Sequence, residues 1–293
     1  IVMERKKDII VAAVVLIVLI VVIGFFTFFR GENKSKKIDV IKSSDTSHKI
    51  SVIFINAGKA DSHLLLVDDK AYLIDTGESE SVVKINDVLM KYGVDKLEGV
   101  FLTHSHSDHV GGLKKLSKEY DIEHLYTSNI SGDKEKLDKV AEKADLTREQ
   151  LVAGDRVEIA EGLYIEVLGP LEYNSDDDND NSIILRLFVN GKVILFTGDM
   201  QYAEEKTLLE SGTDLKCDIL KVGNHGNPDA TSEKFARATS PEYAIITTDT
   251  NVDEDSANEK VKELFENVYV SMDYSLGIKA DIDSDGTISI DEA

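Results

Sequence analysis

The segment Thr103–Gly112, with the sequence THSHSDHVGG, constrains the fold and chemistry of this chain more than any other. It places three histidines and one aspartate within positions 104–109, although the 293 residues include only seven histidines. The apolar residues 100–102 before it predict a buried strand that ends where the histidines begin. Imidazole and carboxylate groups together suit zinc and similar divalent metals. We therefore expect a metal site in this loop, rather than a polar loop with incidental histidines.

Five further segments combine apolar runs with polar residues that suit a site. They are residues 54–62 (FINAGKADS), 73–77 (LIDTG), 181–187 (NSIILRL), 195–199 (LFTGD) and 220–226 (LKVGNHG). With THSHSDHVGG, they resemble the metallo-β-lactamase superfamily, and within it the hydrolase-like domains of ComEC-type competence proteins and phosphorylcholine-esterase-type enzymes. The resemblance covers the chain from about Lys49 onward. Two successive halves of mixed strands and helices fit the α/β fold that it implies, a four-layer αββα sandwich.

The resemblance implies a set of metal ligands and two catalytic residues. The ligands are His104 and His106 for one ion, Asp108 and His109 for a second, Asp199 as the bridging carboxylate, and His225 as a late histidine ligand. Asp108 and His225 are also expected to act in catalysis, Asp108 by orienting the nucleophile. The implied cofactor is Zn²⁺, as one ion or two, with Mn²⁺ as the alternative.

Four other residues are candidates for a supporting or substrate-binding role: Asp61, Asp75, Asn181 and Asn224. Asp75 resembles a buried aspartate that orients a ligand histidine, although a turn-forming role before Thr76-Gly77 is the alternative. Asn224 stands where the family usually has a histidine, and the His-Pro pair that is common in the family near positions 255–258 is absent. These departures leave a mononuclear or weakly active enzyme as an open alternative.

The function that these features predict is hydrolysis of a phosphoester or phosphodiester, in a small or polymeric substrate, by a metal-activated water. Nucleic-acid ends and envelope-type esters both fit. A catalytically weakened binding module of the same fold, or a hydrolase of lactams, lactones or thioesters, is the alternative. The net charge of −22 disfavours extended nucleic-acid binding, because phosphate contacts need lysine and arginine. No feature predicts the oligomeric state.

The N-terminal region predicts a membrane anchor. Residues 1–8 form a short tail, 9–29 an uncharged apolar span, 30–48 a polar linker, and 49–293 the hydrolase domain. The span has the ~20 residues needed to cross a bilayer and exceeds the 7–15 of a signal-peptide core. Five lysines and arginines follow it and three precede it, which favours a cytoplasmic domain. The resemblance favours the opposite side, so we expect a single-pass membrane protein with an extracytoplasmic domain.

Several elements follow from local patterns. Helices are expected near 82–89, 108–120, 134–144, 202–210, 233–238 and 258–265. The acidic run 176–180 is expected to be a solvated loop. Residues 281–292 match the spacing of a calcium-binding EF-hand, but a β-hairpin is favoured because flanking helices are lacking. His48, His63 and His124 are expected to have linker or structural roles.

Overall fold

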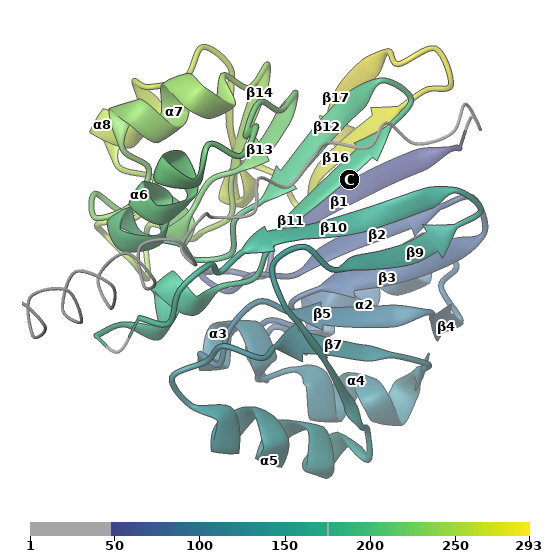
Figure 1. Ribbon diagram of the computed structural model, residues 1–293. Helices are drawn as coiled ribbons and strands as arrows, with labels where there is room; N and C mark the ends of the chain where they lie inside the picture. Colours follow the sequence, from purple (N-terminus) through teal and green to yellow (C-terminus); the bar gives the residue numbers. More distant parts are fainter. Residues whose placement is uncertain (1–47, 175) are drawn as a thin grey trace, which may run out of the picture. The chain divides into compact units, whose positions relative to one another are not determined.

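The computed structural model describes residues 48–174 and 176–293 (Figure 1). Two β-sheets form the centre of this region. The first has the order β17-β16-β1-β2-β3-β5-β7-β8 and the second β15-β14-β13-β12-β11-β10-β9. The strands of the first are β1 (Ile50–Ile55), β2 (His63–Val67), β3 (Lys70–Ile74), β5 (Gly99–Leu102), β7 (Leu125–Ser128), β8 (Arg148–Leu151), β16 (Gly277–Ile282) and β17 (Ile288–Glu292).

The second sheet contains β9 (Arg156–Ala160), β10 (Leu163–Gly169), β11 (Ile184–Val189), β12 (Lys192–Phe196), β13 (Ile219–Lys221), β14 (Tyr243–Ile246) and β15 (Val268–Val270). A short ladder joins β4 (Lys96–Leu97) and β6 (Asp121–Ile122). In both large sheets, the strands that lead to the histidine-containing loops have parallel neighbours. β5 is parallel to β3 and β7, and β13 is parallel to β12 and β14. The loops after these strands therefore emerge from the carboxyl ends of parallel strands, one in each sheet.

Helices cover the outer faces of the sheets. Those beside the first sheet are α2 (Val82–Lys91), α3 (Ser107–Val110), α4 (Leu113–Glu119) and α5 (Lys134–Ala144); those beside the second are α6 (Tyr202–Ser211), α7 (Glu233–Thr239) and α8 (Glu259–Lys262). Three 3₁₀ turns are η1 (Asp178–Asn181), η2 (Asn224–Gly226) and η3 (Ser271–Asp273). Figure 1 shows the two helix groups on opposite sides of the sheets. The expected αββα layering is thus present.

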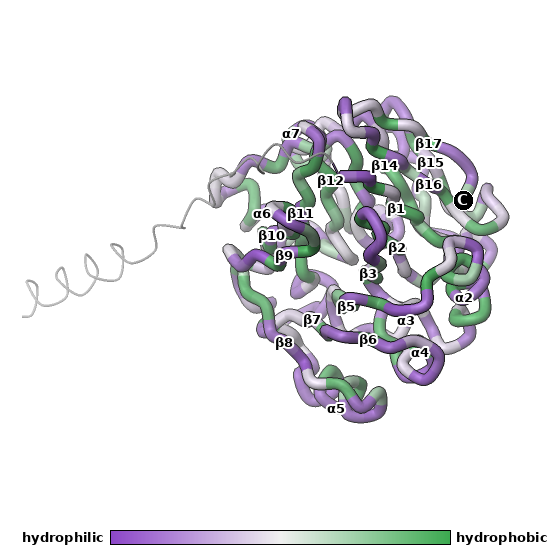
Figure 2. The backbone as a smooth tube through the Cα atoms, turned by 90° about the vertical axis from the view of Figure 1, so that its right-hand side faces the viewer, coloured by the Kyte–Doolittle hydropathy of each residue, from purple (hydrophilic) through white to green (hydrophobic). Residues whose placement is uncertain are grey.

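The central strands β1, β5 and β13 are buried on both faces, which explains why their sequences are largely apolar. In β1, Val52 and Phe54 pack in the core between the sheets, whereas Ile53 and Ile55 pack against the helices of the first layer. A third apolar cluster lies between the second sheet and α6, α7 and α8. Figure 2 shows hydrophobic stretches concentrated in the central strands, with hydrophilic residues on many surrounding loops. Burial on two faces removes the alternation that marks a half-exposed strand.

Most of the expected helices are present, with two changes of extent. The helix expected over 108–120 is two helices, because α3 ends at Val110 and α4 begins at Leu113. Gly112 lies between them, where a Cβ would come within 2.1 Å of the Thr76 carbonyl oxygen. The helix expected over 258–265 is the shorter α8.

The N-terminal segments lie outside the described residues. This holds for the tail at 1–8, the anchor at 9–29 and the linker at 30–47. Within the part of the chain that the structure describes, no helix is both long and apolar enough to cross a membrane. His48, assigned to the linker, is buried, and its Nδ1 lies 2.8 Å from Asp68 Oδ2. The folded domain therefore includes at least one residue of the expected linker.

Candidate metal centre

Four of the expected ligand residues lie in one cluster. They are Asp108, His109, Asp199 and His225, which offer ligand atoms within 4.8 Å of one another. His109 Nε2 lies 3.0 Å from Asp199 Oδ2, and His225 Nε2 lies 3.2 Å from the same oxygen. Asp108 Oδ2 is 3.6 Å from His225 Nε2. The Asp199 carboxylate thus lies between two histidines, one after a strand of the first sheet and one after a strand of the second.

The loops after three strands place these side chains. Asp108 and His109 lie on α3, which follows β5; Asp199 follows β12; and His225 lies in η2, directly after β13. Asn224 and His225 both have positive φ angles, of 42° and 53°. This left-handed conformation is uncommon for residues other than glycine. Two such residues in succession turn the chain sharply, so that His225 lies at the cluster.

His104 and His106 lie beside the cluster but outside the set of four. The His104 ring centroid is 4.1 Å from that of His109 and 4.6 Å from that of His106. Among the described residues, His104 Nε2 is buried without a hydrogen-bond partner, as is Asp199 Oδ1. Buried polar atoms are rarely left unpaired in native proteins. An unpaired nitrogen on a buried histidine and an unpaired oxygen on a buried carboxylate are both available to coordinate a metal.

The charges of the cluster also favour a cation. Burial favours the neutral form of His225, but Asp199 and Asp61 outweigh this effect and raise the pKa of His225 to about 10. Burial opposes charge on His109 as well, yet Asp199 and Asp75 hold its pKa well above the usual value. At His104, burial lowers the pKa far below its usual value, so this imidazole is neutral and can act as a ligand. The donor set therefore fits a divalent metal.

Asp75 supports the cluster from behind. It follows β3 with a φ of 60° and is fully buried. Its Oδ2 lies 2.8 Å from His109 Nδ1, and its Oδ1 accepts a hydrogen bond of 2.8 Å from the Thr103 backbone N–H. Of the two roles considered for Asp75, the geometry fits the aspartate that orients a histidine. Its contact with Nδ1 leaves Nε2 of His109 directed at Asp199.

Asp61 forms a second inner contact. It lies within 4.8 Å of Asp75 and His109 and is completely buried. Burial opposes its ionisation, but Lys221 and His225 lower its pKa to about 2. Asp61 pairs with Lys221, and Asp75 is occupied by Thr103 and His109. The group of Asp61, Asp75 and His109 is therefore a weaker set of metal ligands than the cluster of four residues described above.

The two asparagines are not part of the cluster. Asn181 is buried, and its side chain bonds Asn174 twice, at 2.8 Å to the backbone N–H and 2.8 Å to the carbonyl. It organises its own loop. The Asn224 Nδ2 donates to Asp229 Oδ1 at 3.0 Å. Asn224 therefore precedes His225 in the chain, but its side-chain amide is directed toward Asp229.

Two residues of the site were not identified from the sequence. Asp178, in the acidic run expected to be solvated, accepts hydrogen bonds from the backbone N–H groups of Ser105 (3.0 Å) and Gly132 (2.6 Å). That expectation was wrong, because part of the run anchors the histidine loop. Lys221 is fully buried beside Asp61 and Asp199. A lysine at the end of an otherwise apolar strand was the available signal.

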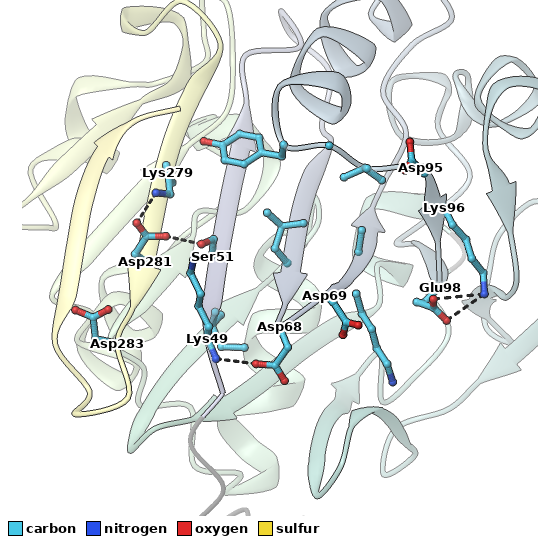
Figure 3. A pocket seen from close by; sticks show the side chains of 17 residues that line it. Lys49, Ser51, Asp68, Asp69, Asp95, Lys96, Glu98, Lys279, Asp281 and Asp283 are labelled. Carbon is cyan, nitrogen blue, oxygen red and sulfur yellow. Dashed lines mark hydrogen bonds and ion pairs between the residues drawn. The ribbon is translucent and has the colours of Figure 1, made fainter.

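A mixed-charge pocket lies at the opposite ends of the strands (Figure 3). Its lining includes Asp281 and Asp283 of the segment with EF-hand spacing. That segment is the hairpin of β16 and β17, as favoured, since these strands pair antiparallel from Ile278↔Glu292 to Ile282↔Ile288. Asp281 bonds Ser51 Oγ and Lys279 Nζ, both at 2.5 Å. Figure 3 shows these contacts among residues of neighbouring strands.

Comparison with known proteins agrees with the motifs. The family model described as Metallo-beta-lactamase superfamily matches residues 55–248. The chain is 29% identical over 200 residues to Competence protein ComA of Neisseria gonorrhoeae, covering 68% of this chain and 27% of that protein. It is 31% identical over 96 residues to Ribonuclease J of Mycoplasma genitalium, covering 30% and 17%. The first curated relatives are thus much longer, since the match spans about a quarter of their length.

The fold has a counterpart among solved structures. The metallo-beta-lactamase fold protein YhfI from Bacillus subtilis superposes with a TM-score of 0.56 over 80% of this chain and 99% of that chain. The sequence identity is 13%, so this likeness concerns the fold alone.

Proposed function

Because the chain belongs to the metallo-β-lactamase superfamily, we propose that it is a metal-dependent hydrolase of phosphoesters or phosphodiesters. The observation that carries the proposal is the buried cluster of Asp108, His109, Asp199 and His225. Its donors suit Zn²⁺, as one ion or two, with Mn²⁺ as the alternative. A metal in such a site acts as a Lewis acid and makes water a usable nucleophile near neutral pH.

The residues around the cluster have distinct tasks in this proposal. Asp75 and the Thr247 carbonyl each hold the Nδ1 of a histidine, which leaves the Nε2 of His109 and of His225 as the ligand atom. Asp199 Oδ2 lies 3.0 Å and 3.2 Å from these two nitrogens, so this carboxylate would hold the metal together with both histidines. Asp108 has a side-chain exposure of 18%, the largest of the four, so we assign it to orient the attacking water. His104 and His106 lie beside these four residues and would supply further ligands.

A phosphodiester substrate is favoured by the names of the relatives. One is called a ribonuclease and another a competence protein. The net charge of −22 makes binding along an extended nucleic acid unfavourable. We therefore propose a short or terminal phosphodiester as the substrate, and an anchor at 9–29 that holds the domain on the extracytoplasmic side of the membrane.

The test is hydrolysis of bis-p-nitrophenyl phosphate by the chelator-treated chain with added Zn²⁺ or Mn²⁺. We expect activity to return with metal, and His109→Ala to reduce kcat/KM by at least about 100-fold, since loss of a ligand removes the Lewis acid. His124→Ala is the matched control, because His124 contacts Glu149 at 2.5 Å, outside the cluster.

Two outcomes would contradict the proposal. Equal activity of the two histidine variants would show that hydrolysis occurs elsewhere. Stoichiometric metal binding without turnover of any phosphoester would favour the alternative, a binding module of the same fold.

A further inference from the structure

Lys221 is a buried cation in a position that the fold would otherwise fill with an apolar side chain. It ends β13 and is fully buried, although lysine is among the residues least often buried. Two positions earlier on the strand, Ile219 packs in the core between the sheets. Because side chains alternate along a strand, Lys221 lies on that same inner face. Its partners therefore decide its role.

Among the described residues, the ammonium group of Lys221 contacts groups that lie at or beside the cluster of ligand residues. It forms an ion pair with the buried carboxylate of Asp61. It also donates a hydrogen bond of 2.9 Å to the carbonyl of Gly198, the residue before Asp199. Finally, Nζ lies 3.5 Å from Asp199 Oδ1. Lys221 thus contacts both the peptide group that precedes Asp199 and one carboxylate oxygen of Asp199.

The carboxylate of Asp61 also connects Lys221 to His225, the other expected ligand that follows a strand of the second sheet. Its Oδ1 accepts a hydrogen bond of 2.5 Å from Thr247 Oγ1 and lies 3.6 Å from His225 Nδ1. The carbonyl of the same Thr247 accepts from His225 Nδ1 at 2.9 Å. A continuous chain of contacts therefore runs from Asp199 through Lys221, Asp61 and Thr247 to His225.

We propose that Lys221 and Asp61 form a positioning pair that holds Asp199 and His225 in ligand geometry, so that the metal binds to a preformed site. This inference rests on the proposed metal-dependent function. The pair is more than a contribution to stability, because an ion pair that served only the fold would not need to contact the loops of two ligands. Outer partners of metal ligands typically affect metal affinity by 10- to 100-fold.

The test measures zinc affinity, by competition with a chromophoric chelator, in the double variant Asp61→Asn/Lys221→Met. Replacing both members avoids leaving one charge buried alone. We expect affinity to fall by about 10- to 100-fold. The control is Glu166→Gln/Arg186→Met, which removes another buried pair, whose Arg186 Nε donates to Glu166 Oε2 at 2.9 Å. Arg186 also bonds the Asp214 carbonyl and has no role at the cluster, so zinc affinity should stay unchanged.

Far-UV circular dichroism and thermal unfolding establish that each variant is folded. If the double variant does not fold, Asp61→Asn alone decides, because it keeps the shape and an acceptor for Thr247; we expect a several-fold loss of affinity. Unchanged or tighter zinc binding in the folded variant would overturn the inference. If the unaltered chain binds no zinc, the proposed function itself fails, which is a separate result.

Discussion

At the scale of single residues, the site depends on side chains that are held from behind. His109 illustrates this, because its Nδ1 lies 2.8 Å from Asp75 and its Nε2 lies 3.0 Å from Asp199. Asp75 itself has a φ of 60°, a conformation that costs about 1–3 kcal/mol for most residues. Its hydrogen bonds with Thr103 and His109 offset that cost. The strained aspartate therefore fixes the orientation of a ligand.

Asp75→Asn should lower kcat/KM by about 10- to 100-fold, because the amide cannot supply the negative charge that orients and polarises His109. The near-isosteric change keeps the acceptor for the Thr103 backbone N–H, so the fold should persist. The measurement is steady-state hydrolysis with saturating metal, beside a thermal unfolding curve. Full activity in a variant that remains folded would show that Asp75 only shapes its turn.

At the scale of elements, separate loops are tied together around the histidines. Asp178, at the start of η1, bonds the backbone of Ser105 in the histidine loop and the backbone of Gly132 before α5. Burial opposes its ionisation, but the Ser105 hydroxyl and these N–H groups lower its pKa. Its carboxylate therefore stabilises the folded state above the unfolded pKa, and this stability is lost as the pH falls through the lower folded value.

We expect Asp178→Ala to lower the free energy of unfolding by roughly 2–4 kcal/mol at pH 7, because it leaves two backbone N–H groups without their acceptor. The loss should be smaller in acid, because the stability that the ionised carboxylate contributes is lost progressively as the pH falls toward its lowered folded pKa. Urea unfolding at pH 7 and pH 3 measures both values. Asp121→Ala, at an exposed position, is the control. Equal losses for the two variants at pH 7 would contradict the anchoring role.

At the scale of the whole molecule, the charge balance makes stability depend on pH. The net charge is −22, and α6 buries two acidic side chains, Glu204 and Glu205. Burial raises the pKa of Glu204 to about 8 and that of Glu205 to about 6. Each folded pKa exceeds the unfolded value of about 4.5. At pH values between the unfolded and the folded pKa, the folded state therefore binds more protons than the unfolded state. The free energy of unfolding should therefore fall as the pH rises from about 4.5 to 8.

Glu204→Gln should reduce this dependence and stabilise the chain at pH 8 by on the order of 4 kcal/mol, with little effect below pH 4.5. The amide oxygen can still accept from the Leu171 N–H, which bonds Glu204 Oε1 at 3.0 Å. Unfolding midpoints across this range provide the measurement. Glu210→Gln, on an exposed side chain of the same helix, is the control. A parallel pH profile for both variants would count against ionisation of Glu204.

The patterns of apolar and polar residues were sufficient to predict the layered α/β fold and the histidine loop. These depend on local chemistry: apolar runs form strands, and the spacing in THSHSDHVGG brings several donors together wherever that loop lies. It also indicated that Asp199 and His225 follow strands, which was enough to expect them at the same sheet edge.

The tertiary structure alone decided which groups support the site. Asp178 and Lys221 act on residues 73 positions earlier and 160 positions earlier in the chain, at Ser105 and Asp61. Nothing local to an acidic loop or to a short strand specifies such partners. A charged side chain is either solvated or buried, depending on which distant backbone groups and carboxylates lie next to it in the folded chain. Only the packing of the two sheets determines those neighbours.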